Sequence, residues 1–310
     1  TAILIGKALK MDAALWTNMQ MNFELDQASI NEKTQIRLAA INIWQMIEDY
    51  IPVKFFKKEG FIVGNPVNDI PVVKAIYNIS NAEQLAAIYT QTQYTRFKKS
   101  DKLSIDKVNM VGWVKLVIYK SLQIKVQKFD SKNEKLLIET LNNIFKKNKN
   151  VIEKTRIELS NYGIKLIVQS HPEKCPVDGI SFWSNGNPAI GITIRHKRID
   201  NFAFTIMHEL GHVFRHLVNN NTAEFIDLEK EYRTNEYKNS KEEIEANEFG
   251  RNALIDKAAW AAFMDENPFF EEAAIVSFSN KQKVHPAIVQ GRFCYETDCF
   301  NIRSSIQKTL

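Results

Sequence analysis

The chain has 310 residues, of which 45% are apolar and 25% are charged, as in ordinary globular proteins. No apolar run approaches the ~20 residues that cross a bilayer and no signal-peptide pattern is visible, so we expect no membrane attachment. The net charge of +5 is mild and spread out, which does not favour a dedicated DNA-binding surface within these residues. The length suits two or three domains.

Residues 1–28 predict two short helices. The first ends near Lys10, and Asp12 caps the second, which carries apolar side chains along one side. Because the chain begins inside a helical pattern with Thr1 rather than Met, we expect a fragment that lacks its original N-terminus.

Residues 29–150 predict a helical linker or middle region. Residues 34–51 form an amphipathic pattern that ends at Pro52. The following residues, 59–150, are mostly helical by spacing and hold the least chemistry, so we expect this region to pack against or separate the others.

Residues 151–310 change character and predict a separate domain. Three segments alternate like strands: 163–170, 179–184 and 187–194. Asp200 or Asn201 then caps a helix that runs to about Val218. We expect a surface loop at 219–240 and further helices at 241–256, at 269–280 and from Pro286. The fold class is therefore α+β, mostly helical, with a small sheet packed on the helix after the strands.

That helix carries the motif His208-Glu209-Leu210-Gly211-His212. Histidines four residues apart project from one helix face, where both imidazoles can bind one tetrahedral Zn²⁺. Glu209 points away from the ligand direction and can take a proton from a metal-bound water. The motif also occurs by chance in ordinary helices, but an apolar face and the glycine between the histidines favour a buried, closely packed helix.

A third ligand is expected from residues 240–250, where three carboxylates compete. Glu243 shares a helix face with Ala246 and Asn247, so Asn247 is a candidate to support a ligating imidazole. Glu243 is also explained by a capping box with Ser240. Glu245 stays an alternative ligand, and Glu242 is expected to be solvated.

His216 lies four residues beyond His212. We expect it to support a ligating histidine from behind or to lie at the rim of the site, because three histidines on one helix rarely close a tetrahedron with a Glu. Three cysteines, an odd number with scattered spacing, argue against a disulfide framework and for a reducing cytoplasm.

The segments "FTIMHELGHVFRHL" and "EEIEANEFGRNALI" together resemble the ImmA/IrrE family of bacterial zinc metallopeptidase domains, over roughly residues 155–295. The resemblance implies metal ligands at His208, His212 and a Glu in 243–245, with the general base at Glu209; the Glu-x-x-Ala-Asn spacing fits Glu243. Two departures are Gly250, where the family usually has Ala, and Asp256, where Pro often follows. His285 or Arg292 is a candidate to approach the site from the C-terminal segment.

The segment "AILIGKALKMDAALWTNMQMNFELDQA" is similar to the final helices of the helix-turn-helix domain in HigA-type antitoxins of the XRE class. This resemblance implies a transcription regulator that binds operator DNA through a full-length N-terminal domain, and we expect the DNA-contacting residues to lie outside this chain. A two-fold protein suits a palindromic operator, which would make it a homodimer.

Three hypotheses follow. In the first, an antitoxin-type regulator carries a zinc peptidase that cuts a peptide bond in a specific partner regulator or cognate toxin. In the second, the zinc-containing domain is a non-catalytic sensor or toxin-binding module. In the third, the domain is an inert fold joined to a transcription regulator, and such a fold would need no stoichiometric zinc.

Overall fold

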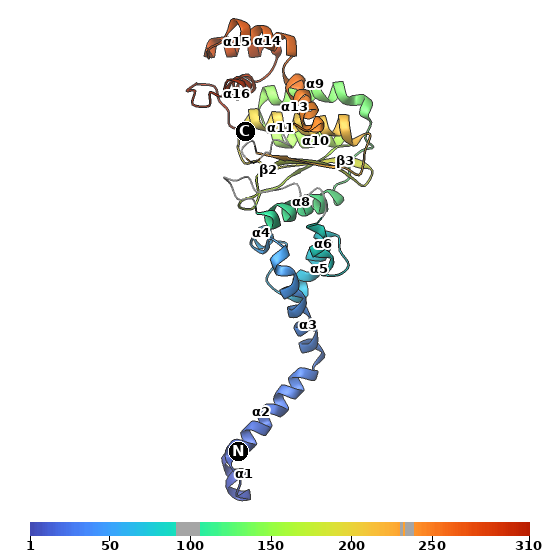
Figure 1. Cartoon of the computed structure of the whole chain (residues 1–310), viewed down its shortest axis with the longest axis vertical. Coiled ribbons are helices and arrows are strands. Elements are labelled where there is room, and N and C mark those ends of the chain that lie inside the picture. Colours follow the sequence, from blue (N-terminus) through green and yellow to red (C-terminus); the bar gives the residue numbers. More distant parts are fainter. Residues whose placement is uncertain (91–105, 230–231, 233–238) are drawn as a thin grey trace. The chain divides into compact units, whose positions relative to one another are not determined.

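The computed structural model describes residues 1–90, 106–229, 232 and 239–310 (Figure 1). The chain divides into two compact units, Thr1–Thr90 and Gln91–Leu310. Among the described residues, no helix is both long enough and apolar enough to cross a membrane.

The first unit is helical. Asp12 accepts a hydrogen bond from the backbone N–H of Ala14, and Asn31 caps the next helix in the same way, so short polar side chains punctuate this region. Residues 34–51 were predicted as one helix, but the α-helix ends at Ile47 and a single 3₁₀ turn follows. The elements are α1 (Ala2–Leu9), α2 (Ala13–Ile30), α3 (Glu32–Ile47), η1 (Glu48–Tyr50), α4 (Val53–Lys58), α5 (Pro66–Tyr77) and α6 (Gln84–Ile88).

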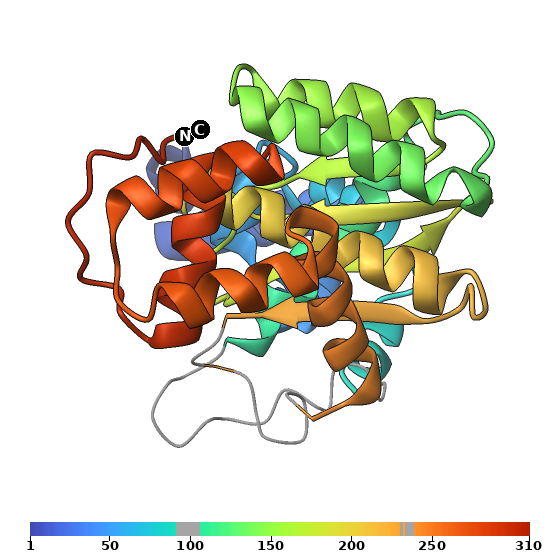
Figure 2. The same ribbon diagram turned by 90° about the horizontal axis from the view of Figure 1, so that it is seen from above.

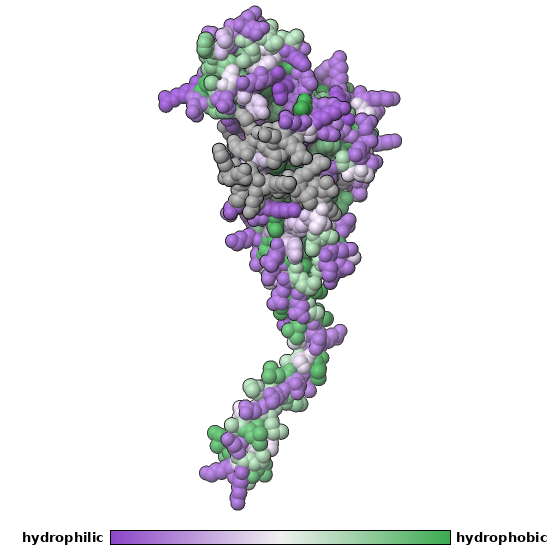
Figure 3. Space-filling view, in the orientation of Figure 1, coloured by the Kyte–Doolittle hydropathy of each residue, from purple (hydrophilic) through white to green (hydrophobic). Residues whose placement is uncertain are grey.

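Helices α1 to α3 expose much of their apolar surface. Helix α2 has no buried residue, and Phe23 on it is 58% exposed. Green patches follow these helices in Figure 3. By contrast, Phe56 on α4 is fully buried and packs edge-on against Tyr77 of α5.

The second unit is a four-stranded sheet with helices on both faces (Figures 1 and 2). The strand order is β1-β3-β2-β4; β1 pairs with β3 in parallel, and β2 pairs with both neighbours in antiparallel fashion. The strands are β1 (Lys165–Val168), β2 (Val177–Ser184), β3 (Asn187–Ile192) and β4 (Glu224–Leu228).

The helices divide between the two faces of this sheet. Helix α8 packs on β1 and β2 from one side, and α9, α10 and α11 lie on the other (Figure 1). The elements are α8 (Lys107–Leu122), η2 (Ser131–Asn133), α9 (Glu134–Lys147), α10 (Val151–Asn161), α11 (Ile199–His212), η3 (Val213–Leu217), α13 (Lys241–Leu254), α14 (Lys257–Glu266), α15 (Glu272–Gln282) and α16 (Pro286–Thr297). The α+β class, mostly helical with a small sheet against the motif helix, is confirmed.

The prediction of a surface loop over 219–240 is wrong for residues 224–228, which form the edge strand β4. The alternation there is weak, because Glu224 and Asp227 interrupt it, so pairing with β2 rather than local pattern makes this strand. Residues 230–231 and 233–238 of the predicted loop lie outside the described residues.

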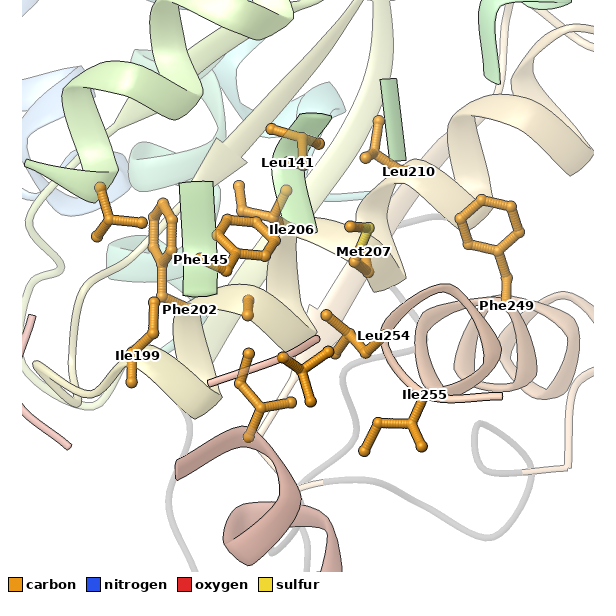
Figure 4. Close-up of a cluster of buried hydrophobic side chains, with 14 of the residues drawn as sticks. Leu141, Phe145, Ile199, Phe202, Ile206, Met207, Leu210, Phe249, Leu254 and Ile255 are labelled. Carbon is orange, nitrogen blue, oxygen red and sulfur yellow. The ribbon is translucent and has the colours of Figure 1, made fainter. Parts of the chain in front are cut away.

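The predicted cap of the motif helix is also wrong. Helix α11 begins at Ile199, so Asp200 lies in its first turn, where it pairs with the Arg198 guanidinium. The α-helix ends at His212, and one π-helical turn continues the segment to Leu217. Aromatic and aliphatic side chains of α9, α11 and α13 meet in one continuous core, shown in Figure 4. Helix α11 is therefore held from several sides.

Candidate metal centre

Helix α11 buries three polar side chains completely. His208, Glu209 and His212 are all 0% exposed, although burying such groups without a partner costs free energy. The Nε2 atoms of the two histidines lie 3.2 Å apart, so both imidazoles point to one place.

Glu243 joins the two histidines from α13. Its Oε2 lies 3.6 Å from His208 Nε2 and its Oε1 lies 3.4 Å from His212 Nε2. Ser240 Oγ caps α13 by accepting from the backbone N–H of Glu243, which leaves the Glu243 carboxylate to the histidines. The backbone, not the carboxylate, thus makes the capping contact.

Two small residues bring α11 and α13 together. A Cβ built on Gly211 would lie 2.9 Å from Ala246 Cα, closer than real Cβ contacts come. Gly250 faces the His208 backbone in the same interface, with its built Cβ 3.2 Å from His208 N. The glycine between the motif histidines therefore permits the approach that places Glu243 beside them.

The residues fit a divalent metal. Atoms that share a tetrahedral Zn²⁺ at about 2.0–2.1 Å are roughly 3.3 Å apart, close to the three separations between His208, His212 and Glu243. Glu243 Oε2 is buried and has no hydrogen-bond donor among the described residues. In the described part of the chain, the salt-bridge partners of this buried carboxylate are two imidazoles. Such a carboxylate is suited to binding a cation.

Glu209 is fixed from strand β2. Ser181 Oγ donates to Glu209 Oε2 at 2.5 Å, while Oε1 has no donor among the described residues. Gly179 lies directly beside this carboxyl, because a Cβ there would be 2.1 Å from Oε1. Burial, then the negative charge of Asp227, raises the pKa of Glu209 well above its usual range. The carboxyl is thus positioned for proton transfer.

A second layer supports His212. Its Nδ1 lies 3.1 Å from His216 Nδ1, and His216 Nε2 lies 3.0 Å from Glu245 Oε2. Because an ionised carboxylate only accepts, His216 Nε2 donates to Glu245 and its Nδ1 accepts from His212. Burial lowers the pKa of His216, in keeping with the neutral ring that this chain of bonds requires. The other ring nitrogen, His212 Nε2, then carries a lone pair, which is the form that binds a metal ion.

The sequence-predicted residues therefore divide into two groups. The structure brings together His208, Glu209, His212 and Glu243, and it places His216 and Glu245 behind them. In the described part of the chain, Asn247 makes no hydrogen bond to a histidine.

The two C-terminal candidates make their contacts elsewhere. His285 caps α16 by accepting from the Ala287 backbone N–H. The Arg292 guanidinium lies 4.5 Å from the centre of the Trp260 ring and donates to Glu296. Neither belongs to the metal-binding cluster.

Strand β4 adds two residues that the sequence did not reveal. Phe225 stacks on the His212 ring at 4.6 Å, and buried Asp227 has Oδ2 3.9 Å from His208 Nε2. Asp227, His208 and Glu209 form a second group whose ligand atoms lie within 4.8 Å of one another. Ser181 was detectable, since small residues alternate at Gly179 and Ser181 in a buried strand; for Asp227 the local pattern offers no such signal.

A family comparison agrees with this arrangement, in which two histidines on α11 meet a Glu on α13 beside a carboxyl held by the sheet. Residues 162–274 match Peptidase_M78, the IrrE N-terminal-like domain. The matched range contains all four strands, α11 and α13, and so the whole cluster. The match indicates a zincin-like, metallopeptidase-type domain over these residues.

The match supports one of the two sequence resemblances. The resemblance to the ImmA/IrrE domain is confirmed for residues 162–274, whereas the resemblance of residues 1–28 to a helix-turn-helix domain stays a prediction, because the family match does not reach it. A comparison with curated proteins finds no match.

Proposed function

We propose that residues 151–310 form a zinc-dependent peptidase domain that hydrolyses a peptide bond in a specific protein partner. The observation that carries this proposal is the convergence of His208, His212 and Glu243 beside a separate, sheet-held carboxyl of Glu209. A structural site would not need that additional carboxyl. A zinc ion bound there would lower the pKa of a coordinated water and polarise the scissile carbonyl.

The chain's own residues divide the remaining work. His208, His212 and Glu243 would hold the metal, and His216 with Glu245 would keep His212 in the right tautomer. Glu209 would accept a proton at Oε1, the oxygen without a donor, and return it to the leaving amine. Ser181 would keep Oε2 engaged, so that one oxygen is committed to position and the other to proton transfer.

A second candidate function is a non-catalytic, zinc-containing sensor or toxin-binding module. It is favoured by burial: the two histidines and Glu209 are 0% exposed and Glu243 is 3% exposed. Closed metal sites that contribute to folding are typically shielded in this way, whereas a peptidase must admit its substrate.

The wider role is proposed from sequence resemblance alone. We propose that the full-length protein is an XRE/HigA antitoxin-type regulator that binds operator DNA as a homodimer, and that the peptidase substrate is a partner regulator or cognate toxin. This part is supported by the 28-residue resemblance and is separate from the evidence for the metal centre.

The deciding measurement is zinc per chain by elemental analysis, for the wild type and for His212→Ala. One zinc per chain that is lost in the variant would support the site. No zinc after reconstitution of the wild type would contradict both candidate functions.

Glu209→Gln then separates the two candidates. The peptidase proposal expects zinc to stay and cleavage of the partner to disappear. Unchanged partner cleavage in this variant would contradict the assigned base. Partner binding without cleavage in the wild type would favour the sensor or binding module.

A further inference from the structure

Two of the three cysteines lie at the two ends of one helix-capping motif, far in sequence from the metal cluster. Cys294 is on the last turn of α16, and Cys299 follows the helix after Asp298, which adopts a left-handed conformation with φ of 55°. The Cys299 backbone N–H donates to the Cys294 carbonyl at 3.1 Å. This is the six-residue hydrogen bond of a Schellman cap.

The cap brings the two cysteines close together. In a Schellman cap the side chains at these two positions frequently contact each other. Standard backbone dimensions add about 2.4 Å from Cα to O and about 1.5 Å from N to Cα. With the 3.1 Å hydrogen bond, the two Cα atoms lie within about 7 Å even if all atoms were collinear. Disulfides need roughly 4.4–6.8 Å between Cα atoms.

The pair also has one accessible and one protected member. Cys299 is exposed, whereas Cys294 is buried beside α11, and the third cysteine, Cys175, is buried on its own in the loop before β2. Burial raises the pKa of the Cys294 thiol, while the nearby Lys308 and Arg198 charges oppose that shift. A small disulfide in solution would therefore react with Cys299 first, and Cys294 lies close enough to attack the Cys299 sulfur afterwards.

We infer that Cys294 and Cys299 form a reversible dithiol–disulfide site that exchanges with small disulfides. The Cys299 thiolate attacks one sulfur of oxidised glutathione, the glutathione S–S bond breaks, and one glutathione thiolate leaves. The Cys294 thiolate then attacks the Cys299 sulfur of the mixed disulfide and releases the second glutathione. Two protein thiols are oxidised and one small disulfide is reduced to two thiols.

The location gives this bond a structural consequence. The segment after Cys299 returns to the start of α11, where the Ile199 N–H donates to the Lys308 carbonyl at 2.8 Å and the Leu310 N–H donates to the Lys197 carbonyl at 3.2 Å. A disulfide at the beginning of this C-terminal segment would restrict it where it leaves α16. In a reducing compartment such a bond would be transient, as in redox-sensing pairs.

The test treats the full chain with oxidised glutathione and follows intact mass and peptide maps without reduction. The wild type and the control Cys175→Ser should each lose two hydrogen atoms and yield a peptide linked between 294 and 299. Free thiols in the wild type should fall from three to one, because the linkage uses two of the three cysteines.

Two variants test the separate roles of the two cysteines. Cys299→Ser, at an exposed position, should abolish the link while leaving zinc content and melting temperature unchanged. Cys294→Ala should stop at the mixed disulfide between Cys299 and glutathione. A wild type that also stops at that mixed disulfide, with Cys294 still free, would overturn the inference.

Discussion

Helices α2 and α11 differ in burial more than in composition. Helix α2 has 18 residues and none is buried, whereas 11 of the 14 residues of α11 are buried, including both motif histidines and Glu209. Strand β2, α13 and α16 cover α11 within its unit. A buried helix can hold ligands in one geometry, because its neighbours fix the rotamers and exclude water. The apolar side chains of α2 are exposed instead.

The largest expected effect concerns the base on the buried helix. Glu209→Gln should lower peptide hydrolysis by roughly 10²–10⁴-fold, the usual contribution of a general base, because the amide cannot accept the proton. The measurement is the yield of new amino termini in a lysate digested by wild type or variant, with bound zinc determined in parallel.

Glu248→Gln is the matched control, since this Glu lies on the exposed side of α13 and pairs with Lys257. It should cleave like the wild type. Wild-type activity in Glu209→Gln would show that the buried Glu209 carboxyl stabilises the fold and takes no part in the reaction.

The close contact between α11 and α13 predicts a loss of stability from an otherwise favourable substitution. Ala normally stabilises a helix over Gly by ~1 kcal/mol. At Gly211, however, the new Cβ meets the Ala246 backbone, so Gly211→Ala should lower the free energy of unfolding by about 1–3 kcal/mol. Urea denaturation measures this value.

Gly250→Ala provides the comparison in the same interface. Its Cβ would lie 3.2 Å from His208 N rather than 2.9 Å from a backbone Cα, so the loss should be smaller. If Gly211→Ala were more stable than Gly250→Ala, α11 and α13 would not approach each other at Gly211 as closely as described.

Burial also explains what the sequence could and could not predict. The motif helix, the candidate third ligand Glu243 and three of the four strands follow local periodicity and spacing, which the sequence displays directly. Strand β4 and Asp227 depend on pairing with β2, a long-range contact that leaves a weak local pattern. From the sequence, the choice between Glu243 and Glu245 depended on their positions around the helix. In the structure Glu243 contacts His212, whereas Glu245 contacts His216.

A smaller effect is expected from the layer behind His212. His216→Ala should weaken zinc affinity by about 10–100-fold, as loss of such supporting groups generally does, because His212 would lose the acceptor that fixes its tautomer. Competition with a chromophoric chelator gives the dissociation constant. Glu245→Gln should weaken affinity less, since Glu245 acts through His216.

Asn247→Ala is the control for this layer and should bind zinc like the wild type. A result in which Asn247→Ala weakens binding as much as His216→Ala would return Asn247 to the role predicted from the sequence.

The smallest effect is expected on α2, and it tests the contrast between the exposed α2 and the buried α11. Phe23→Ala removes a ring that is 58% exposed and should change the free energy of unfolding by no more than about 0.5 kcal/mol. Phe56→Ala, in the same unit but with a ring that is 0% exposed, should cost about 3–5 kcal/mol. Both values come from urea denaturation at several protein concentrations. A large, concentration-dependent loss in Phe23→Ala would mean that α2 is buried between chains in solution, so its apolar surface would already have a partner in a second copy.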